Sequence, residues 1–183
     1  MPKGGGGGGH AGGAGRPARS RSNPLSEQER RAVSDYTGSE YGRLNTRLRE
    51  GHELEHYQRE LAEHLDAVLA KLPAYKKTTY RVLDVYGEQE LAKFVSQHEV
   101  GAVVSYKQFV SSAKEPGSFG SWATWSGKNI VRLTIEGKSG RSIQHLSQFT
   151  SEKEVLFGRK ARFTVTHRSQ RGSGGWDITI KEL

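Results

Sequence analysis

The spacing of hydrophobic residues in this chain differs before and after Pro73. Before Pro73, apolar residues recur at spacings of three and four, which is typical of one helix face. The members of this pattern are Leu54, Tyr57, Leu61, Leu65, Val68, Leu69 and Leu72. From Thr78 onwards, short apolar runs alternate with turn residues, which is typical of strands. Helices followed by strands predict an α+β domain, with N-terminal helices packed on two antiparallel-rich β-sheets.

Local signals refine the expected elements. Ser26 and Glu29 form a capping-box pattern, so a first helix is expected to begin there and to break near Gly38. A second short helix should end by Gly51, and the third should end before Pro73. Strands are expected at 79–85, 100–106, 108–113, 129–135, 141–145, 153–157, 160–167 and 176–181, with a short helix at 88–97.

Residues 1–24 differ in composition from the rest of the chain. They are rich in Gly, Ala, Arg and Ser and contain an unbroken glycine run at 4–9. Such a segment buries too little apolar surface to offset its ordering entropy, so a flexible linker is expected. It is either a tether to something larger or a tail without a role. Residues 25–183 are expected to form one domain, with a helical part at 25–73 and a β-rich core at 78–183.

Composition narrows the class of protein. The chain has 183 residues and no cysteine, which excludes disulfides, thiolate metal sites and a thiol nucleophile. No apolar run is long enough to span a membrane, and no signal-peptide core follows Met1. Any export is therefore expected to use another route. The net charge is +8, and Lys3, Arg16, Arg19 and Arg21 precede the first acid, so half of the excess lies on the N-terminal segment.

Two carboxylates stand two residues apart where an apolar run begins, at Glu152 and Glu154. On a strand they would point the same way, with Cα atoms roughly 6.5–7 Å apart. Paired acids at the rim of a core can divide acid and base work, because their environments separate their pKa values. Taken alone, such a pair is more often the solvated start of a strand.

Three motifs follow one another along the chain: Tyr80-Arg81, then Phe109-Val110-Ser111-Ser112-Ala113, then Glu152-Lys153-Glu154-Val155-Leu156. In these motifs and their order the chain resembles the arginine-specific mono-ADP-ribosyltransferases of the toxin-like clade. The run 41–49 is also similar to the clade's Asn-x-x-Leu-Arg segment. The resemblance covers roughly residues 26–183 and implies the ADP-ribosyltransferase fold with NAD as co-substrate and no metal.

The resemblance also implies the catalytic roles. Glu154 matches the catalytic Glu, which steadies positive charge on the ribose as nicotinamide leaves. Ser111 matches the Ser that orients this Glu. Glu152 matches the Glu that marks arginine-modifying members, where a carboxylate can grip a guanidinium and take its proton.

The remaining binding residues follow from the same resemblance. Arg81 and Arg49 match residues that hold the NAD phosphates, since a guanidinium fork suits phosphate oxygens. Tyr80, Ser112 and Asn45 are expected around the cofactor. Phe119, in the loop at 114–128, could stack on nicotinamide.

The turn at 146–151 matches the family's target-recognition turn, with Phe149 as its exposed aromatic. The chain departs from the family pattern in two places. It reads Ser111-Ser112-Ala113 where Ser-Thr-Ser is usual, so the hydroxyl of the third motif residue is missing. Val82 follows Arg81 where Gly is often found, which alters the pocket.

The resemblance and composition together predict a secreted effector that modifies an arginine of a target protein in the cytoplasm of the target cell. A cognate immunity protein is expected in the producing cell, with no membrane association. Two alternatives stay open: transfer to a nucleic-acid acceptor, and a basic nucleic-acid-binding module without enzymatic activity. No nucleic-acid motif in the sequence supports the second.

Overall fold

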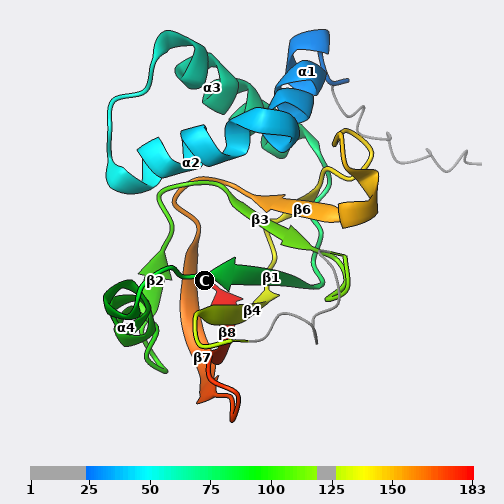
Figure 1. The fold of residues 1–183 in the computed structure, drawn as a ribbon. Helices are drawn as coiled ribbons and strands as arrows, with labels where there is room; N and C mark the ends of the chain where they lie inside the picture. The colour runs from blue at the N-terminus through cyan, green and yellow to red at the C-terminus, as the bar shows by residue number, and fades with distance from the viewer. Residues whose placement is uncertain (1–23, 119–126) are drawn as a thin grey trace, which may run out of the picture.

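The computed structural model describes residues 24–118 and 127–183. The helical part comprises α1 (Glu27–Asp35), η1 (Tyr36–Glu40), α2 (Tyr41–Glu50) and α3 (His56–Lys71). The β-rich part comprises β1 (Thr78–Asp84), α4 (Glu88–Gln97), β2 (Val103–Ser105), β3 (Val110–Ala113), β4 (Ile130–Glu136), β5 (Arg141–Ser142), η2 (Thr150–Glu152), β6 (Glu154–Phe157), β7 (Arg162–Gln170) and β8 (Trp176–Glu182). In Figure 1 the helices α1 to α3 form a layer over β3 and β6, and the β7–β8 hairpin lies at the opposite end.

The start of the helical part follows the sequence. The Ser26 hydroxyl accepts from the Glu29 backbone N–H at 3.1 Å, and the Glu29 carboxylate accepts from the Ser26 N–H at 2.7 Å. The Lys71 ammonium at the end of α3 donates to the same carboxylate at 2.7 Å. This pairing ties the first and third helices together, and it lowers the pKa of Glu29 mainly through the Lys71 hydrogen bond.

The expected break at Gly38 is absent. The chain stays helical from α1 through η1, a π-helical turn, into α2. Glycine only weakens a helix, and here the wider turn accommodates it while Tyr36 and Thr37 are both buried. The other predicted ends are confirmed, because Gly51 caps α2 in the left-handed conformation and α3 ends two residues before Pro73.

The strands form one hydrogen-bonded sheet of eight among the described residues, in the order β2-β7-β8-β4-β1-β3-β6-β5. All pairs are antiparallel except β4 and β8. The α+β class is confirmed, but the two expected sheets are continuous with each other. Their junction is narrow, since β1 pairs with β3 only through Tyr80 and Ala113.

Two apolar cores lie on either side of β3 and β6. One contains the helical layer together with Phe109, Ile143 and Leu156. The other contains Val110, Val155 and the inner residues of β4, β7 and β8. Alternate residues of β3 and β6 therefore face different cores, as the pleat of a strand requires. This alternation decides which motif residues can reach the candidate site.

Candidate functional site

Ser111 and Glu154 come together because β3 pairs with β6. The antiparallel register places Ala113 opposite Glu154 and Ser111 opposite Leu156, so all four side chains share one face. That face meets the helical layer, and the Glu154 side chain is almost fully enclosed, with the residue only 4% exposed. The structure therefore brings the side chains of Ser111 and Glu154 within hydrogen-bonding distance, as the sequence predicts.

The carboxyl of Glu154 is electrostatically unusual. Burial raises its pKa from an ordinary 4.5 to about 7, and the charge of Glu152 adds to the rise. A hydrogen bond with Ser111 and the charge of Arg81 act in the opposite direction and lower the pKa. The group therefore changes its protonation state near neutral pH, which is typical of acids and bases at functional sites.

Glu152 is close to Glu154. The sequence pattern predicts both acids on one strand, but in the structure Glu152 lies outside the strand that contains Glu154. It ends the 3₁₀ turn η2, and Lys153 then adopts a left-handed conformation with φ of 49°. The Lys153 ammonium donates to the Glu115 carboxylate at 2.6 Å. A turn of this kind rotates Glu152 out of the strand's alternation, so its placement depends on Lys153 rather than on the pleat. Partial burial raises the pKa of Glu152 as well.

Tyr36, which belongs to none of the sequence motifs, completes this cluster. The Tyr36 hydroxyl, in η1, lies 3.3 Å from Ser111 Oγ and accepts a hydrogen bond from Asn45 Nδ2 at 2.9 Å. Tyr36 is fully buried, which raises the pKa of its phenol. A hydrogen-bonded chain therefore runs from Asn45 through Tyr36 and Ser111 to Glu154. The nine-residue gap between Tyr36 and Asn45 gives no sequence signal, because the π-helical turn sets their phase.

Asn45 contributes to the cluster mainly as a support for Tyr36. Its Oδ1 is buried and has no hydrogen-bond partner among the described residues. A buried acceptor without a partner costs free energy, and a ligand donor would satisfy it.

Arg81 connects the acids to a neighbouring cavity. Its guanidinium donates to the Ser111 carbonyl, and burial lowers its pKa from the ordinary value. Arg81 also lines a cavity of about 950 Å³. The cationic group that the sequence predicted opposite the acids is therefore present.

The cavity extends from Arg81 along α4 and β2, and Arg49 from α2 reaches its rim. Its volume is in the range of sites that enclose a cofactor. Ser111 and Glu154 adjoin this space through Arg81, and neither these two residues nor Glu152 line it.

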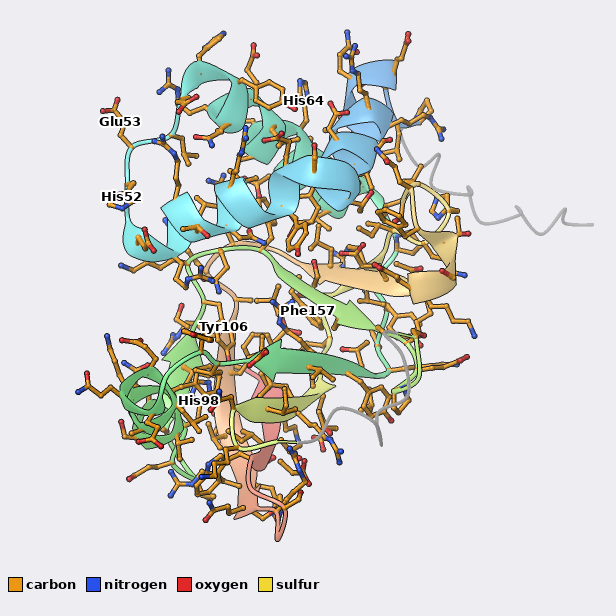
Figure 2. The ribbon with its side chains drawn as sticks, in the orientation of Figure 1. His52, Glu53, His64, His98, Tyr106 and Phe157 are labelled. Carbon is orange, nitrogen blue, oxygen red and sulfur yellow. The ribbon has the colours of Figure 1, made fainter. Side chains whose placement is uncertain are left out.

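A histidine and a tyrosine fix the wall of the cavity at α4. His98 Nδ1 donates to the Phe94 carbonyl at 2.7 Å, and Nε2 accepts from the Tyr106 hydroxyl at 2.8 Å. Figure 2 shows these two side chains beside α4. Burial lowers the pKa of His98, in agreement with the neutral ring that this hydrogen-bond pattern requires.

Two of the predicted cofactor residues are placed elsewhere. Ser112 faces the opposite side of β3 from Ser111, is fully buried and donates to the Val155 carbonyl at 3.0 Å. Tyr80 alternates with Arg81 on β1 and is not among the described residues that line the cavity. Because neighbours on a strand face opposite ways, Ser112 points away from Ser111 and Tyr80 away from Arg81, and a cofactor contact of either residue stays a prediction. Phe119 lies outside the described residues.

Phe149 stands at the surface beside Glu152, as predicted for the recognition turn. Its ring is half-exposed, and its backbone N–H donates to Ser147 Oγ at 3.0 Å. The Glu152 N–H donates to the Phe149 carbonyl at 3.1 Å, so the two residues belong to one turn.

Across residues 24–118 and 127–183, no group of three or more His, Asp or Glu side chains is arranged to hold a metal ion. His64 lies on α3 in the helical layer, as Figure 2 shows. Within the same residues, no helix combines the length and apolar character that crossing a membrane needs.

The sequence of this chain is similar to those of known proteins. Residues 17–181 match the ADP-ribosyltransferase exoenzyme family. The NAD(+)–protein-arginine ADP-ribosyltransferase Tre1 of Serratia proteamaculans is 33% identical over 161 residues, which cover 87% of this chain and 33% of that protein. A protein of Vibrio splendidus named as a putative NAD(+)–arginine ADP-ribosyltransferase, Vis, is 29% identical over 78% of this chain and 59% of its own.

Solved structures give the same fold. The Vis structure with its M6 inhibitor superposes with a TM-score of 0.71 at 25% identity, over 87% of this chain and 74% of that one. Exoenzyme S of Pseudomonas aeruginosa, at 24% identity, also gives a TM-score of 0.71, over 86% of this chain and 74% of that one. The chain spans about a third of the length of Tre1. By sequence and by fold, this chain belongs to the ADP-ribosyltransferase exoenzyme family.

Proposed function

We propose that the protein is a mono-ADP-ribosyltransferase that transfers ADP-ribose from NAD to an arginine of a target protein and releases nicotinamide. The observation that carries this proposal is the buried carboxyl of Glu154, hydrogen-bonded to Ser111, with Glu152 beside it and Arg81 opposite. Family membership and the naming of Tre1 as a protein-arginine ADP-ribosyltransferase support it.

Glu154 acts on the bond that breaks. As the nicotinamide–ribose bond cleaves, its electron pair leaves with nicotinamide and positive charge develops on the ribose. A fixed carboxylate in a largely dry site stabilises that charge far better than it would in water. Ser111 holds the carboxylate in place, Tyr36 is hydrogen-bonded to Ser111, and Asn45 donates to Tyr36. Because Glu154 and Ser111 are already oriented by burial and hydrogen bonds, they need not move as the charge develops.

Glu152 acts on the acceptor. A guanidinium is protonated at physiological pH and has no free electron pair for attack. The partly buried carboxylate of Glu152, with its raised pKa, can bind the guanidinium and accept the proton as the new C–N bond forms. Two acids are therefore needed for two different charges.

NAD is proposed to lie along the cavity, with its diphosphate between Arg81 and Arg49. The unpaired Asn45 Oδ1 could take a donor from the bound molecule. Phe119 stays a proposed nicotinamide contact, and Phe149 a proposed contact with the target protein. Residues 1–24 are proposed as a tether for the domain at 25–183.

The biological setting is proposed from the relatives. Exoenzyme T and secreted exoenzyme S of Pseudomonas aeruginosa, at 26% identity each, match 82% and 76% of this chain. These relatives support a secreted effector. We propose that it acts in the cytoplasm of a target cell and that the producing cell contains an immunity protein.

The proposal is tested by incubating the protein with labelled NAD and a cell lysate, followed by protease, nuclease or hydroxylamine, which releases arginine-linked ADP-ribose. Label that protease and hydroxylamine remove is the expected result. Label removed by nuclease would identify a nucleic-acid acceptor instead. No incorporated label, together with no release of nicotinamide, would overturn the enzymatic assignment and favour a binding module.

A further inference from the structure

In the turn that carries Phe149 and Glu152, Gln148 forms hydrogen bonds with the helical layer. Its backbone N–H donates to Thr37 Oγ1 at 3.1 Å. Its side-chain amide donates to the Ser34 carbonyl at 2.8 Å and lies 3.2 Å from Ser34 Oγ. Thr37 is buried and donates in turn to the Val33 carbonyl at 2.9 Å. Gln148 is thus bonded on both sides to the end of α1 and the start of η1.

The contact between Gln148 and the helical layer requires a residue without a side chain at Gly38. A Cβ atom added at Gly38 would lie 2.6 Å from Gln148 Nε2, well inside contact distance. The obstructing atom is the end of a flexible side chain, so a larger residue would displace the amide rather than disrupt the core. Gly42, four residues later on the same continuous helix, has nothing within 4 Å of an added Cβ.

The same π-helical turn reaches the catalytic cluster from its other side. Tyr36 points to Ser111, while Thr37 and Gly38 meet Gln148. Tyr36 and Thr37 are consecutive residues of this turn, and both are buried. One helical turn therefore supports both the Ser111–Glu154 pair and the turn bearing Glu152.

We infer that Gln148 is a positioning residue that orients Glu152 and Phe149 for the arginine acceptor. Thr37 binds its backbone, and the absence of a side chain at Gly38 leaves room for its amide. This inference rests on the proposed function. The path is short, because Glu152 is bonded through its N–H to the Phe149 carbonyl, directly after Gln148. Glu154 and Ser111 are held by β3, β6 and Tyr36, so they do not depend on Gln148.

The experiment compares Gly38→Ala, Gln148→Ala and the double variant, with Gly42→Ala as the matched control. Transfer to agmatine and hydrolysis of NAD are measured for each, together with a thermal melt. Loss of a hydrogen-bonded contact of this kind predicts a fall of about five-fold in kcat/KM for agmatine. NAD hydrolysis should stay within about two-fold of the unmodified protein, and Gly42→Ala should match it in both reactions.

The double variant should also lose about five-fold and not the product of the two single effects, because both changes remove one contact. Three results would overturn the inference: unchanged agmatine transfer in Gln148→Ala, equal loss of both reactions at an unchanged melting temperature, or multiplicative effects. Failure of the unmodified protein to transfer to agmatine, while it hydrolyses NAD, would instead contradict the proposed arginine acceptor, and the inference would fall with it.

Discussion

The two ends of the candidate site are built differently. At the acid end, Ser111 and Glu154 face the helical layer and are aligned by a chain of hydrogen bonds from Asn45 and Tyr36, with Glu152 partly exposed beside them. The cavity end, made of Arg49, Arg81 and the wall at α4, is open space beside a short helix with no buried residue.

The difference shows how one fold separates chemistry from binding. Burial at the acid end moves the pKa of Glu154 close to neutrality, which suits a group that must meet a developing charge. Space at the cavity end suits a large substrate, and arginine side chains need no dry surroundings to keep their charge. Changes at the acid end should therefore alter the rate, and changes at the cavity end should alter substrate binding.

The largest effect is expected from Glu154→Gln. This variant keeps the shape and loses the charge, so NAD hydrolysis and arginine transfer should both fall by about 10³-fold or more. Glu136→Gln, at the exposed end of β4, is the control and should be unchanged. Retention of either activity in Glu154→Gln would remove Glu154 from the mechanism.

The same variant should be more stable than the unmodified protein at high pH. Between pH 4.5 and about 7 the folded protein keeps a proton on Glu154 that the unfolded chain releases, so the free energy of unfolding falls as pH rises through this window. Gln cannot ionise, and we expect a melting temperature about 2–4 °C higher at pH 8, with the gain lost at pH 4. Calorimetry at the two pH values measures this.

Glu152→Gln should separate the two reactions. Arginine transfer should fall by about 10²-fold or more because the guanidinium loses its base, while NAD hydrolysis should persist. Nicotinamide release measured with and without agmatine gives both rates. Parallel loss of the two activities would contradict the separate roles of the acids.

The pH profile of NAD hydrolysis should report Glu154. The ionised form is required, so kcat should fall tenfold per pH unit as the pH drops below about 7. A rate–pH profile from pH 5 to 9 tests this. A profile that stays flat down to pH 5 would mean that Glu154 remains ionised there.

The smallest effects compare the two ends directly through a pair of tyrosines. Tyr36→Phe removes the link between Asn45 and Ser111, so we expect kcat to fall about tenfold with an unchanged KM for NAD. Tyr106→Phe leaves His98 Nε2 without its donor, so we expect KM for NAD to rise about three-fold at constant kcat. Steady-state kinetics distinguish the two patterns, and the same response in both variants would erase the contrast between the ends.

Long patterned segments were predictable from the sequence. The apolar face of α3, the left-handed cap at Gly51 and the run of strands follow local rules, and the motifs identified Ser111, Glu154 and Arg81. The π-helical turn was not predictable, because a glycine within a helical pattern resembles a break, and only tertiary contacts with Gln148 and Ser111 favour its continuation.

Lys153 and Ser112 illustrate what local patterns do not show. A left-handed lysine is rare, and its stabilising contact with Glu115 lies 38 residues away, so the strand was expected to begin one residue too early. Ser112 belongs to a motif, but the motif alone does not say that its side chain faces the second core.

The parallel pair of β4 and β8 has a consequence for the order of assembly. Residues 176–182 are made after every other strand in the sheet, yet β8 lies between β7 and β4 near its middle. A chain still emerging from the ribosome therefore lacks the strand that joins the β2–β7 edge to the rest. We expect a nascent chain to lack the complete sheet until that strand has been inserted.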